Sequence, residues 1–216
     1  MNIDQSLKKE FINLLKSTER DGVDDLLEEL EDLGFFDAPA SSRFHLNYDG
    51  GLVEHSLNVC HVALGLRDQM IGFNKEMEEY LPKDSVIIAS LLHDVCKADI
   101  YKKVTKRRKD KRTGNVTVSE GFKLDYTNFP MGHGEKSAIV CMRAGLAMTD
   151  YELLAIRWHM SAWDLPFQSA DIKENLNKAR DICPLCAIIQ TADTLATNIL
   201  ERKRTDEDED EYVYLD

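Results

Sequence analysis

The stretch that most constrains this chain is an apolar segment that ends in a histidine–aspartate pair. Residues 85–97 read SVIIASLLHDVCK. The apolar residues between 86 and 92 leave no polar face, so the sequence predicts one helix over 85–97 that is buried on most sides. Burying His93 and Asp94 at its end is costly unless a partner or a metal ion satisfies them. An imidazole beside a carboxylate suits a borderline divalent cation.

Length, composition and cysteine content limit the classes of protein to which this chain can belong. The 216 residues suffice for a domain with a substantial core, and the 43% apolar content is ordinary for a globular chain. The sequence has no run of about 18 apolar residues and no apolar signal-peptide core at its start. Five cysteines, an odd number, predict reduced thiols in a cytoplasmic protein. Cys183 and Cys186 form a single CxxC, which is a poor zinc site and is interpreted as a pair of buried thiols.

The charge is unevenly distributed along the chain. The net charge of -12 argues against general or stable nucleic-acid binding. Residues 101–112 nevertheless carry eight Lys or Arg against one Asp. This segment is either a solvated hairpin or an arm that attracts phosphate, and both interpretations stay open. The six consecutive acids of residues 206–211 predict a solubilising, disordered tail within 204–216.

The hydrophobic periodicity predicts a mainly α protein with one small β insertion. Besides the central helix, apolar residues at helical spacing indicate helices near 3–17, 22–33, 52–70, 135–147, 150–160 and 184–201. Between the helices, residues 101–128 contain two β-branched runs around Thr113, Gly114 and Asn115 and predict a β-hairpin. The helices within 1–35 are expected either to pack on the main domain or to form a dimer interface.

The histidines reveal an ordered series with two aspartates. In chain order it consists of His55, His93, Asp94, His133, His159 and Asp193. The local sequences GGLVEHSLNV, LLHDVCK, GHGEKS, IRWHM and QTADTLAT, which contain these residues, resemble the HD superfamily of metal-dependent phosphohydrolases. The resemblance covers roughly residues 48–200 and is closest to small, single-domain bacterial and phage members.

The resemblance implies a helical bundle around a metal centre, with the domain at residues 36–203. It assigns His55, His93, Asp94 and Asp193 to a first divalent metal ion. In members with two further histidines, His133 and His159 would hold a second ion and Asp94 would bridge the two. The ligand types favour Mn, Fe, Co, Ni or Zn, with Mg at a second site.

Three cations and one acid lie near these residues in the sequence. Lys97 stands one turn after Asp94 and is a candidate to contact a substrate phosphate or to pair with a carboxylate. Lys136 and Arg157 are further substrate-binding candidates, and Glu54 would either orient a ligand or lie exposed. Asp94, Lys97 and His133 are the predicted catalytic residues.

Several of these residues also have a structural interpretation. His133 lies between two glycines, where it would cap a helix, and His159 would be a core histidine. Asp193 is harder to explain without a cation, because it interrupts an apolar helix. His45 and His61 match no motif and are interpreted as structural or surface residues.

The expected function is the metal-dependent hydrolysis of a phosphoester, in a nucleotide or a related small phosphate ester. A phosphodiesterase for cyclic nucleotides or oligonucleotides is the alternative within this class. An alternative of another class is a non-catalytic, metal-containing protein that binds nucleotides. The substrate, the native metal, the number of ions and a homo-oligomeric state are left open by the sequence.

Overall fold

The computed structural model describes residues 5–109, 115–161, 170–202 and 213–214. The helices in this part of the chain are α1 (Gln5–Lys16), α2 (Val23–Asp32), α3 (Gly51–Phe73), α4 (Met77–Tyr80), α5 (Lys83–Leu92), α6 (His133–Arg143), α7 (Asp150–Trp158), α8 (Ala170–Ile182) and α9 (Pro184–Leu195). A 3₁₀ turn, η1 (Val95–Asp99), follows α5, and a π-helical turn, η3 (Ala196–Leu200), follows α9. The predicted mainly α fold is confirmed.

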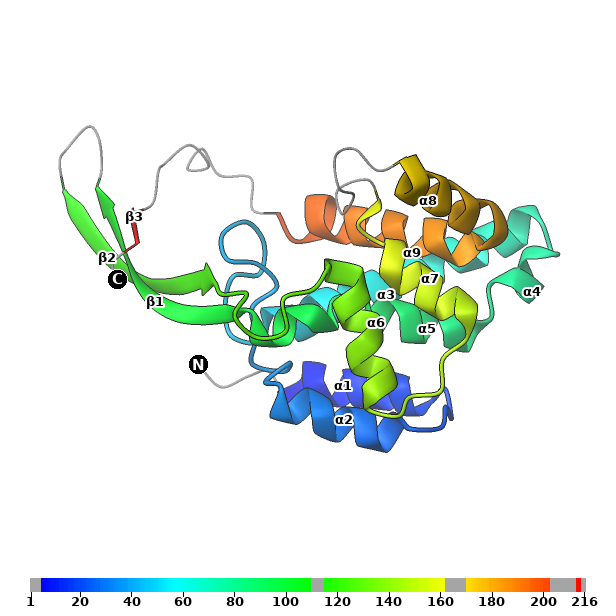
Figure 1. Cartoon of the computed structure of the whole chain (residues 1–216), viewed down its shortest axis with the longest axis horizontal. Helices are drawn as coiled ribbons and strands as arrows, with labels where there is room; N and C mark the ends of the chain where they lie inside the picture. The colour runs from blue at the N-terminus through cyan, green and yellow to red at the C-terminus, as the bar shows by residue number, and fades with distance from the viewer. Residues whose placement is uncertain (1–4, 110–114, 162–169, 203–212, 215–216) are drawn as a thin grey trace.

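Helix α5 is the central element of the bundle. It packs against α3, α7 and α9, and Figure 1 shows these helices grouped on one side of the molecule. All eight of its residues from Ser85 to Leu92 are buried, as the unbroken apolar sequence predicts. The N-terminal helices belong to the same core, since Phe11 of α1 and Leu26 of α2 are fully buried within it.

The central helix is shorter than the predicted range of 85–97. It ends at Leu92, and the chain continues as η1 rather than as α-helix. The physical reason lies at the helix end, where the carbonyl of Ser90 has no hydrogen-bond partner within the helix. Nδ1 of the His93 ring donates a hydrogen bond to that carbonyl instead. Asp94 then leaves the helical conformation, with φ -110° and ψ 19°. The predicted helix was therefore wrong beyond residue 92.

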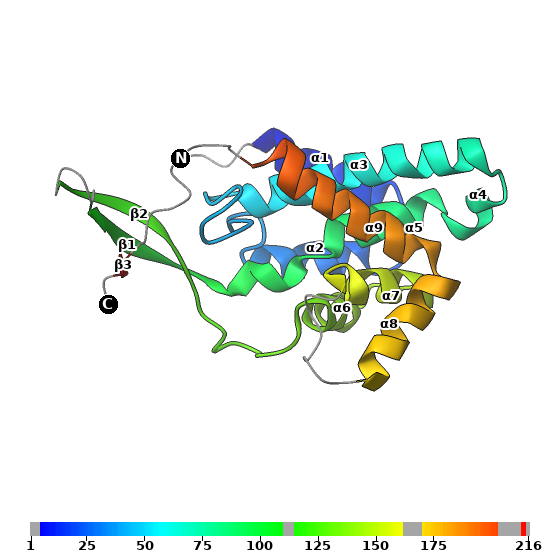
Figure 2. The same cartoon turned by 90° about the horizontal axis from the view of Figure 1, so that it is seen from above.

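A β-hairpin projects from the helical body (Figures 1 and 2). Its strands β1 (Tyr101–Lys109) and β2 (Val116–Leu124) are antiparallel, with Tyr101 opposite Leu124. This confirms the predicted β insertion, although Thr113 and Gly114 of its turn lie outside the described residues. A short strand β3 (Val213–Tyr214) pairs with the other edge of β1. The acids at 206–211 also lie outside the described residues.

Two elements near the C-terminus differ from the sequence-based expectation. Helix α8 was not predicted, because it is mostly polar and buries mainly Leu176 and Ala179. The last predicted helix, 184–201, is α-helical only to Leu195. It then widens into η3, where the N–H of Glu201 donates to the carbonyl of Ala196, five residues back.

The five cysteines are free and buried, including Cys183 and Cys186 at the start of α9. In the described part of the chain, no single helix has both the length and the apolar content to cross a bilayer. The residues 172–182 and 184–200 pass that test only as a pair, bent by 102°.

Candidate metal centre

Two histidines at helix ends are oriented in the same way by the backbone. His93 is the C-cap of α5 and His159 is the C-cap of α7. Each places its Nδ1 2.7 Å from a carbonyl three residues earlier, that of Ser90 or of Ile156. Because a carbonyl only accepts, Nδ1 must carry the proton and the neutral ring presents the lone pair of Nε2 to the centre.

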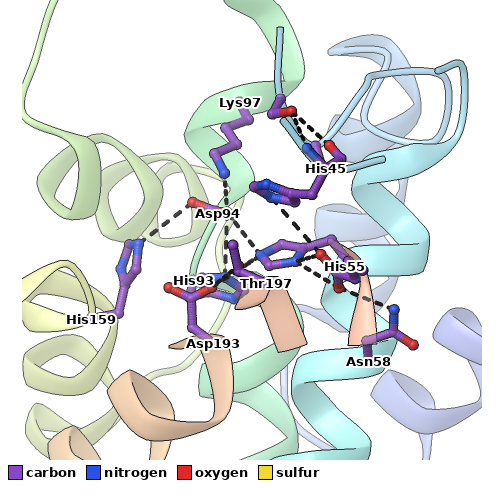
Figure 3. A network of polar contacts seen from close by, with 12 residues as sticks. His45, His55, Asn58, His93, Asp94, Lys97, His159, Asp193 and Thr197 are labelled. Carbon is purple, nitrogen blue, oxygen red and sulfur yellow. Dashed lines mark hydrogen bonds and ion pairs between the residues drawn. The ribbon is translucent and has the colours of Figure 1, made fainter. Parts of the chain in front are cut away.

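His55 is oriented by a carboxylate instead. It lies on α3, and its Nδ1 is 3.0 Å from Oε2 of Glu201, at the end of η3. The amide of Asn58 donates to the other oxygen of Glu201 at 3.0 Å. The carboxylate thereby fixes the proton on Nδ1 and leaves Nε2 of His55 directed towards the centre, as second-shell carboxylates do for metal-ligating histidines (Figure 3).

The first group of donor atoms consists of Nε2 of His55, Nε2 of His93, Oδ2 of Asp94 and Oδ1 of Asp193. Nε2 of His55 lies 3.2 Å from Nε2 of His93, 3.3 Å from Oδ2 of Asp94 and 3.4 Å from Oδ1 of Asp193. Neighbouring ligands of a metal ion with bonds of 2.0–2.2 Å are separated by about 3.0–3.4 Å. Two imidazole lone pairs facing each other at hydrogen-bond distance also need a cation between them. The residues therefore fit a divalent metal ion.

A second group of donor atoms is built on the other oxygen of Asp94. Oδ1 lies 2.7 Å from Nε2 of His133, at the start of α6, and 3.5 Å from Nε2 of His159. Among the described residues, Nε2 of His159 is a buried atom with no hydrogen-bond partner. The two oxygens of Asp94 thus face different histidines, which is the geometry of a carboxylate shared by two metal ions.

Asp94 forms an ion pair with Lys97. Nζ of Lys97 is 2.7 Å from Oδ2 of Asp94. Burial opposes the charge on Asp94, but Lys97 and the adjacent His93 hold the pKa of the carboxyl well below its usual range. Burial likewise opposes a charge on His133, whereas Cys96 and Asp94 raise the pKa of His133 to about 9. The field of the centre therefore favours positive charge.

Asp193 enters the centre from α9. Its side chain is 18% exposed, and Oδ1 accepts a hydrogen bond of 3.2 Å from the hydroxyl of Thr197, one turn later. Burial opposes ionisation, but His55 and His93 depress the pKa of Asp193 below its ordinary value. The carboxylate that interrupts the apolar helix is thus directed at histidine rings.

The other residues selected from the sequence have partners of their own. Lys136 is buried, with its ammonium 2.5 Å from Asp99 and 3.2 Å from the carbonyl of Asn128. Arg157 pairs with Glu135 at 2.5 Å and stacks on its neighbour Trp158. In the described residues neither of these two cations pairs with a carboxylate of the centre.

Glu54 and His61 lie on α3 but away from the donor atoms. Glu54 accepts a hydrogen bond of 2.5 Å from the hydroxyl of Tyr48. His61 is exposed and pairs with Glu10 of α1 at 2.9 Å, which agrees with its interpretation as a surface residue.

Sequence reasoning missed two residues at the centre, Glu201 and His45. Glu201 carried a usable signal, because an acid at the C-terminal end of a helix opposes the helix dipole and needs a reason to be there. His45 lies in the loop before α3, with its ring centroid 5.3 Å from that of His55. It does not lie on the surface, since its side chain is only 12% exposed.

Two comparisons with known proteins found a match. The model of the HD domain matches residues 52–198. Over 125 residues the chain is 30% identical to the dihydroneopterin 2',3'-cyclic phosphate phosphodiesterase of Methanocaldococcus jannaschii. The match covers 57% of this chain and 44% of that relative, so the chain spans less than half of its length. No solved structure matches the chain significantly.

Proposed function

The chain belongs to the HD domain family, and we propose that it is a metal-dependent phosphohydrolase that cleaves the phosphoester bond of a nucleotide or a related small phosphate ester. The family, together with the phosphodiesterase relative, supports a hydrolase acting on phosphoester bonds. The single observation that carries the proposal is the division of the two Asp94 oxygens between two sets of histidines.

The metal ligands in this proposal are those of the two donor groups. His55, His93, Asp94 and Asp193 would hold one divalent ion, and Asp94, His133 and His159 a second. Mixed imidazole and carboxylate donors favour Mn, Fe, Co, Ni or Zn, with Mg at the second position. When bound, such ions neutralise phosphoryl oxygens and lower the pKa of a water molecule.

The chain's own residues supply the remaining chemistry. Lys97, whose ammonium is within 2.7 Å of Asp94, is close enough to donate to a non-bridging phosphoryl oxygen of a substrate at the centre. Glu201 keeps the proton on Nδ1 of His55. His133 lies at the exposed side of the centre, with 24% of its side chain accessible, and without a second ion its Nε2 would instead hold a proton beside Asp94. Lys136 and Arg157 remain substrate-binding candidates only if substrate displaces Asp99 or Glu135.

A second candidate within the same class is a phosphodiesterase that opens a cyclic phosphate or cleaves a short oligonucleotide. Two observations favour it. The two oxygens of Asp94 face different histidines, which would let two ions share the carboxylate and suits the in-line displacement of a diester oxygen. The relative is named for a 2',3'-cyclic phosphate.

The experiment that tests the proposal is a hydrolysis screen of the full chain with Mn²⁺, Co²⁺, Ni²⁺ or Mg²⁺. The panel contains nucleoside mono- and triphosphates, 2',3'- and 3',5'-cyclic nucleotides and bis(p-nitrophenyl) phosphate. We expect release of product by the wild type and none by Asp94→Ala with a retained fold. No turnover of any phosphoester would refute the proposal and favour the non-catalytic nucleotide-binding alternative.

The partner and the location follow from the same proposal. We expect a small anionic phosphate ester as the substrate and no stable complex with nucleic acid, in line with the net charge of -12. The five free thiols support a reducing, cytoplasmic location. Gel filtration coupled to light scattering would determine whether the chain forms a homo-oligomer.

A further inference from the structure

The side chain of His45 is half-buried, and both of its ring nitrogens are shielded from solvent. In the described part of the chain, neither of its ring nitrogens has a hydrogen-bond partner. Its Nε2 lies 3.9 Å from Oε2 of Glu201, beyond hydrogen-bond distance. Two hydrogen bonds to Ser41 fix the backbone of His45. The hydroxyl of Ser41 donates to the carbonyl of His45 at 2.6 Å, and the hydroxyl oxygen accepts from the N–H of His45 at 3.0 Å.

The surroundings of the ring are those of the reaction centre. Figure 3 shows His45 between Lys97 and His55, on the side of Asp94 that faces Lys97. Burial, followed by the charge of Lys97, lowers the pKa of His45 to about 4. In either protonation state the imidazole carries at least one N–H, and among the described residues no acceptor lies within hydrogen-bond distance of its ring nitrogens.

A purely structural role would leave this arrangement unexplained. A buried polar group without a partner destabilises a fold by about 1–3 kcal/mol, and an apolar ring of similar shape would avoid that cost. Donor atoms of His45, His55 and Glu201 lie within 4.8 Å of one another, but Nδ1 of His55 and Oε2 of Glu201 already form a hydrogen bond of 3.0 Å, which disfavours a metal ion at this position.

We propose that His45 is a substrate-contacting residue whose imidazole N–H donates a hydrogen bond to an oxygen of the phosphate ester, beside the ammonium of Lys97. This assignment rests on the proposed phosphohydrolase function. It extends the phosphate-binding side of the centre from one cation to a cation and an imidazole donor.

The loop that carries His45 also borders a cavity. Phe44 and Leu46, the neighbours of His45, line a cavity of about 300 Å³ together with Tyr48, Asn58 and other residues. The cavity also includes Glu201, whose carboxylate supports His55. His45, Lys97 and the metal-ligand candidates are not among the residues that line this cavity.

The test compares His45→Phe, which keeps a ring and removes the donor, with His45→Gln, which keeps an N–H. His61→Phe is the matched control, because His61 lies exposed on α3 and pairs with Glu10. Three quantities are measured on Mn²⁺-loaded full chain: the metal content, the midpoint of thermal unfolding, and the Kd for inorganic phosphate by calorimetry. The kcat and KM of a substrate found in the screen are added.

We expect His45→Phe to keep the metal and to unfold at the same or a higher temperature. Its phosphate affinity should fall about 10-fold and its kcat/KM about 100-fold, because a donor to a charged oxygen is lost. His45→Gln should recover most of the phosphate affinity, and His61→Phe should match the wild type.

Other results would overturn the assignment. Loss of metal in His45→Phe would make His45 a ligand, and a lower unfolding temperature with unchanged phosphate affinity would make it structural. Absence of phosphate binding to the wild type would also refute the contact. If no phosphoester is hydrolysed but phosphate binding still depends on His45, the proposed activity fails while the contact stands.

Discussion

Replacing Glu201 by glutamine tests whether this residue controls the metal centre through His55. Two donors converge on the carboxylate, Nδ1–H of His55 on Oε2 and the amide of Asn58 on Oε1, both at 3.0 Å. Glutamine offers one acceptor oxygen and one amide group that itself donates. Because Nδ1 of His55 also lies 3.1 Å from Oε1, one neutral oxygen would have to accept both hydrogen bonds in the variant while the new amide nitrogen faces Nδ1.

The size of the effect follows from this geometry. Glu201 is buried, with only 1% of its side chain exposed, so water cannot replace the lost acceptor. Removing an outer-sphere partner of a metal-ligating histidine typically lowers metal affinity about 10- to 100-fold, which equals about 1.4–2.7 kcal/mol. We expect the loss in Glu201→Gln to lie in this range, since His55 no longer has a carboxylate to fix its proton on Nδ1.

The assay is a competition for Mn²⁺ between the protein and a chelator of known affinity. The matched control is Glu54→Gln on the same helix α3, because Glu54 contacts Tyr48 and not a histidine of the centre. Equal metal affinity of Glu201→Gln and the wild type would show that Glu201 does not orient His55. An equal loss of Mn²⁺ affinity in both variants would attribute the effect to the removed negative charge rather than to the hydrogen bond between Glu201 and His55.

Three further predictions concern a cation at the centre, a buried ion pair and the hairpin. Lys97→Met should retain its metal and lower kcat/KM about 10- to 100-fold, which steady-state kinetics would measure; unchanged kinetics would assign Lys97 to ion pairing alone. Arg20→Ala breaks the pair of 2.8 Å contacts with the fully buried Glu152 and should lower the free energy of unfolding by about 3–5 kcal/mol in urea titrations. A loss below about 1 kcal/mol would contradict that estimate. The double variant Lys103→Glu and Arg107→Glu should leave KM unchanged, because the hairpin projects from the helical body. A several-fold rise in KM would identify a phosphate-attracting arm.

The sequence was most informative where burial and polarity conflict. An apolar helix that ends in His93 and Asp94, and an aspartate inside another apolar helix, both predicted a centre, and the structure brings their side chains together with those of His55, His133 and His159. These residues are recognisable because each carries a cost that only a partner or a cation removes.

The residues that sequence reasoning missed belong to irregular or polar segments. His45 lies in a loop whose path depends on the Ser41 contacts and on packing, neither of which leaves a periodic pattern. The approach of Glu201 to His55 follows a π-helical turn that the apolar pattern of residues 184–201 does not distinguish from α-helix. The break after Leu92 depends on a side-chain contact of His93, and α8 has too few apolar residues for its period to stand out.

The metal content of three proteins tests the central claim most directly. Wild type, His133→Ala and Asp94→Ala are purified without chelators or a metal-binding tag and analysed by mass spectrometry of the elements. If Asp94 is shared by two ions, the wild type holds about two ions per chain, His133→Ala about one and Asp94→Ala close to none. One ion in the wild type that persists in His133→Ala would contradict the shared centre and make His133 a substrate-binding or acid–base residue.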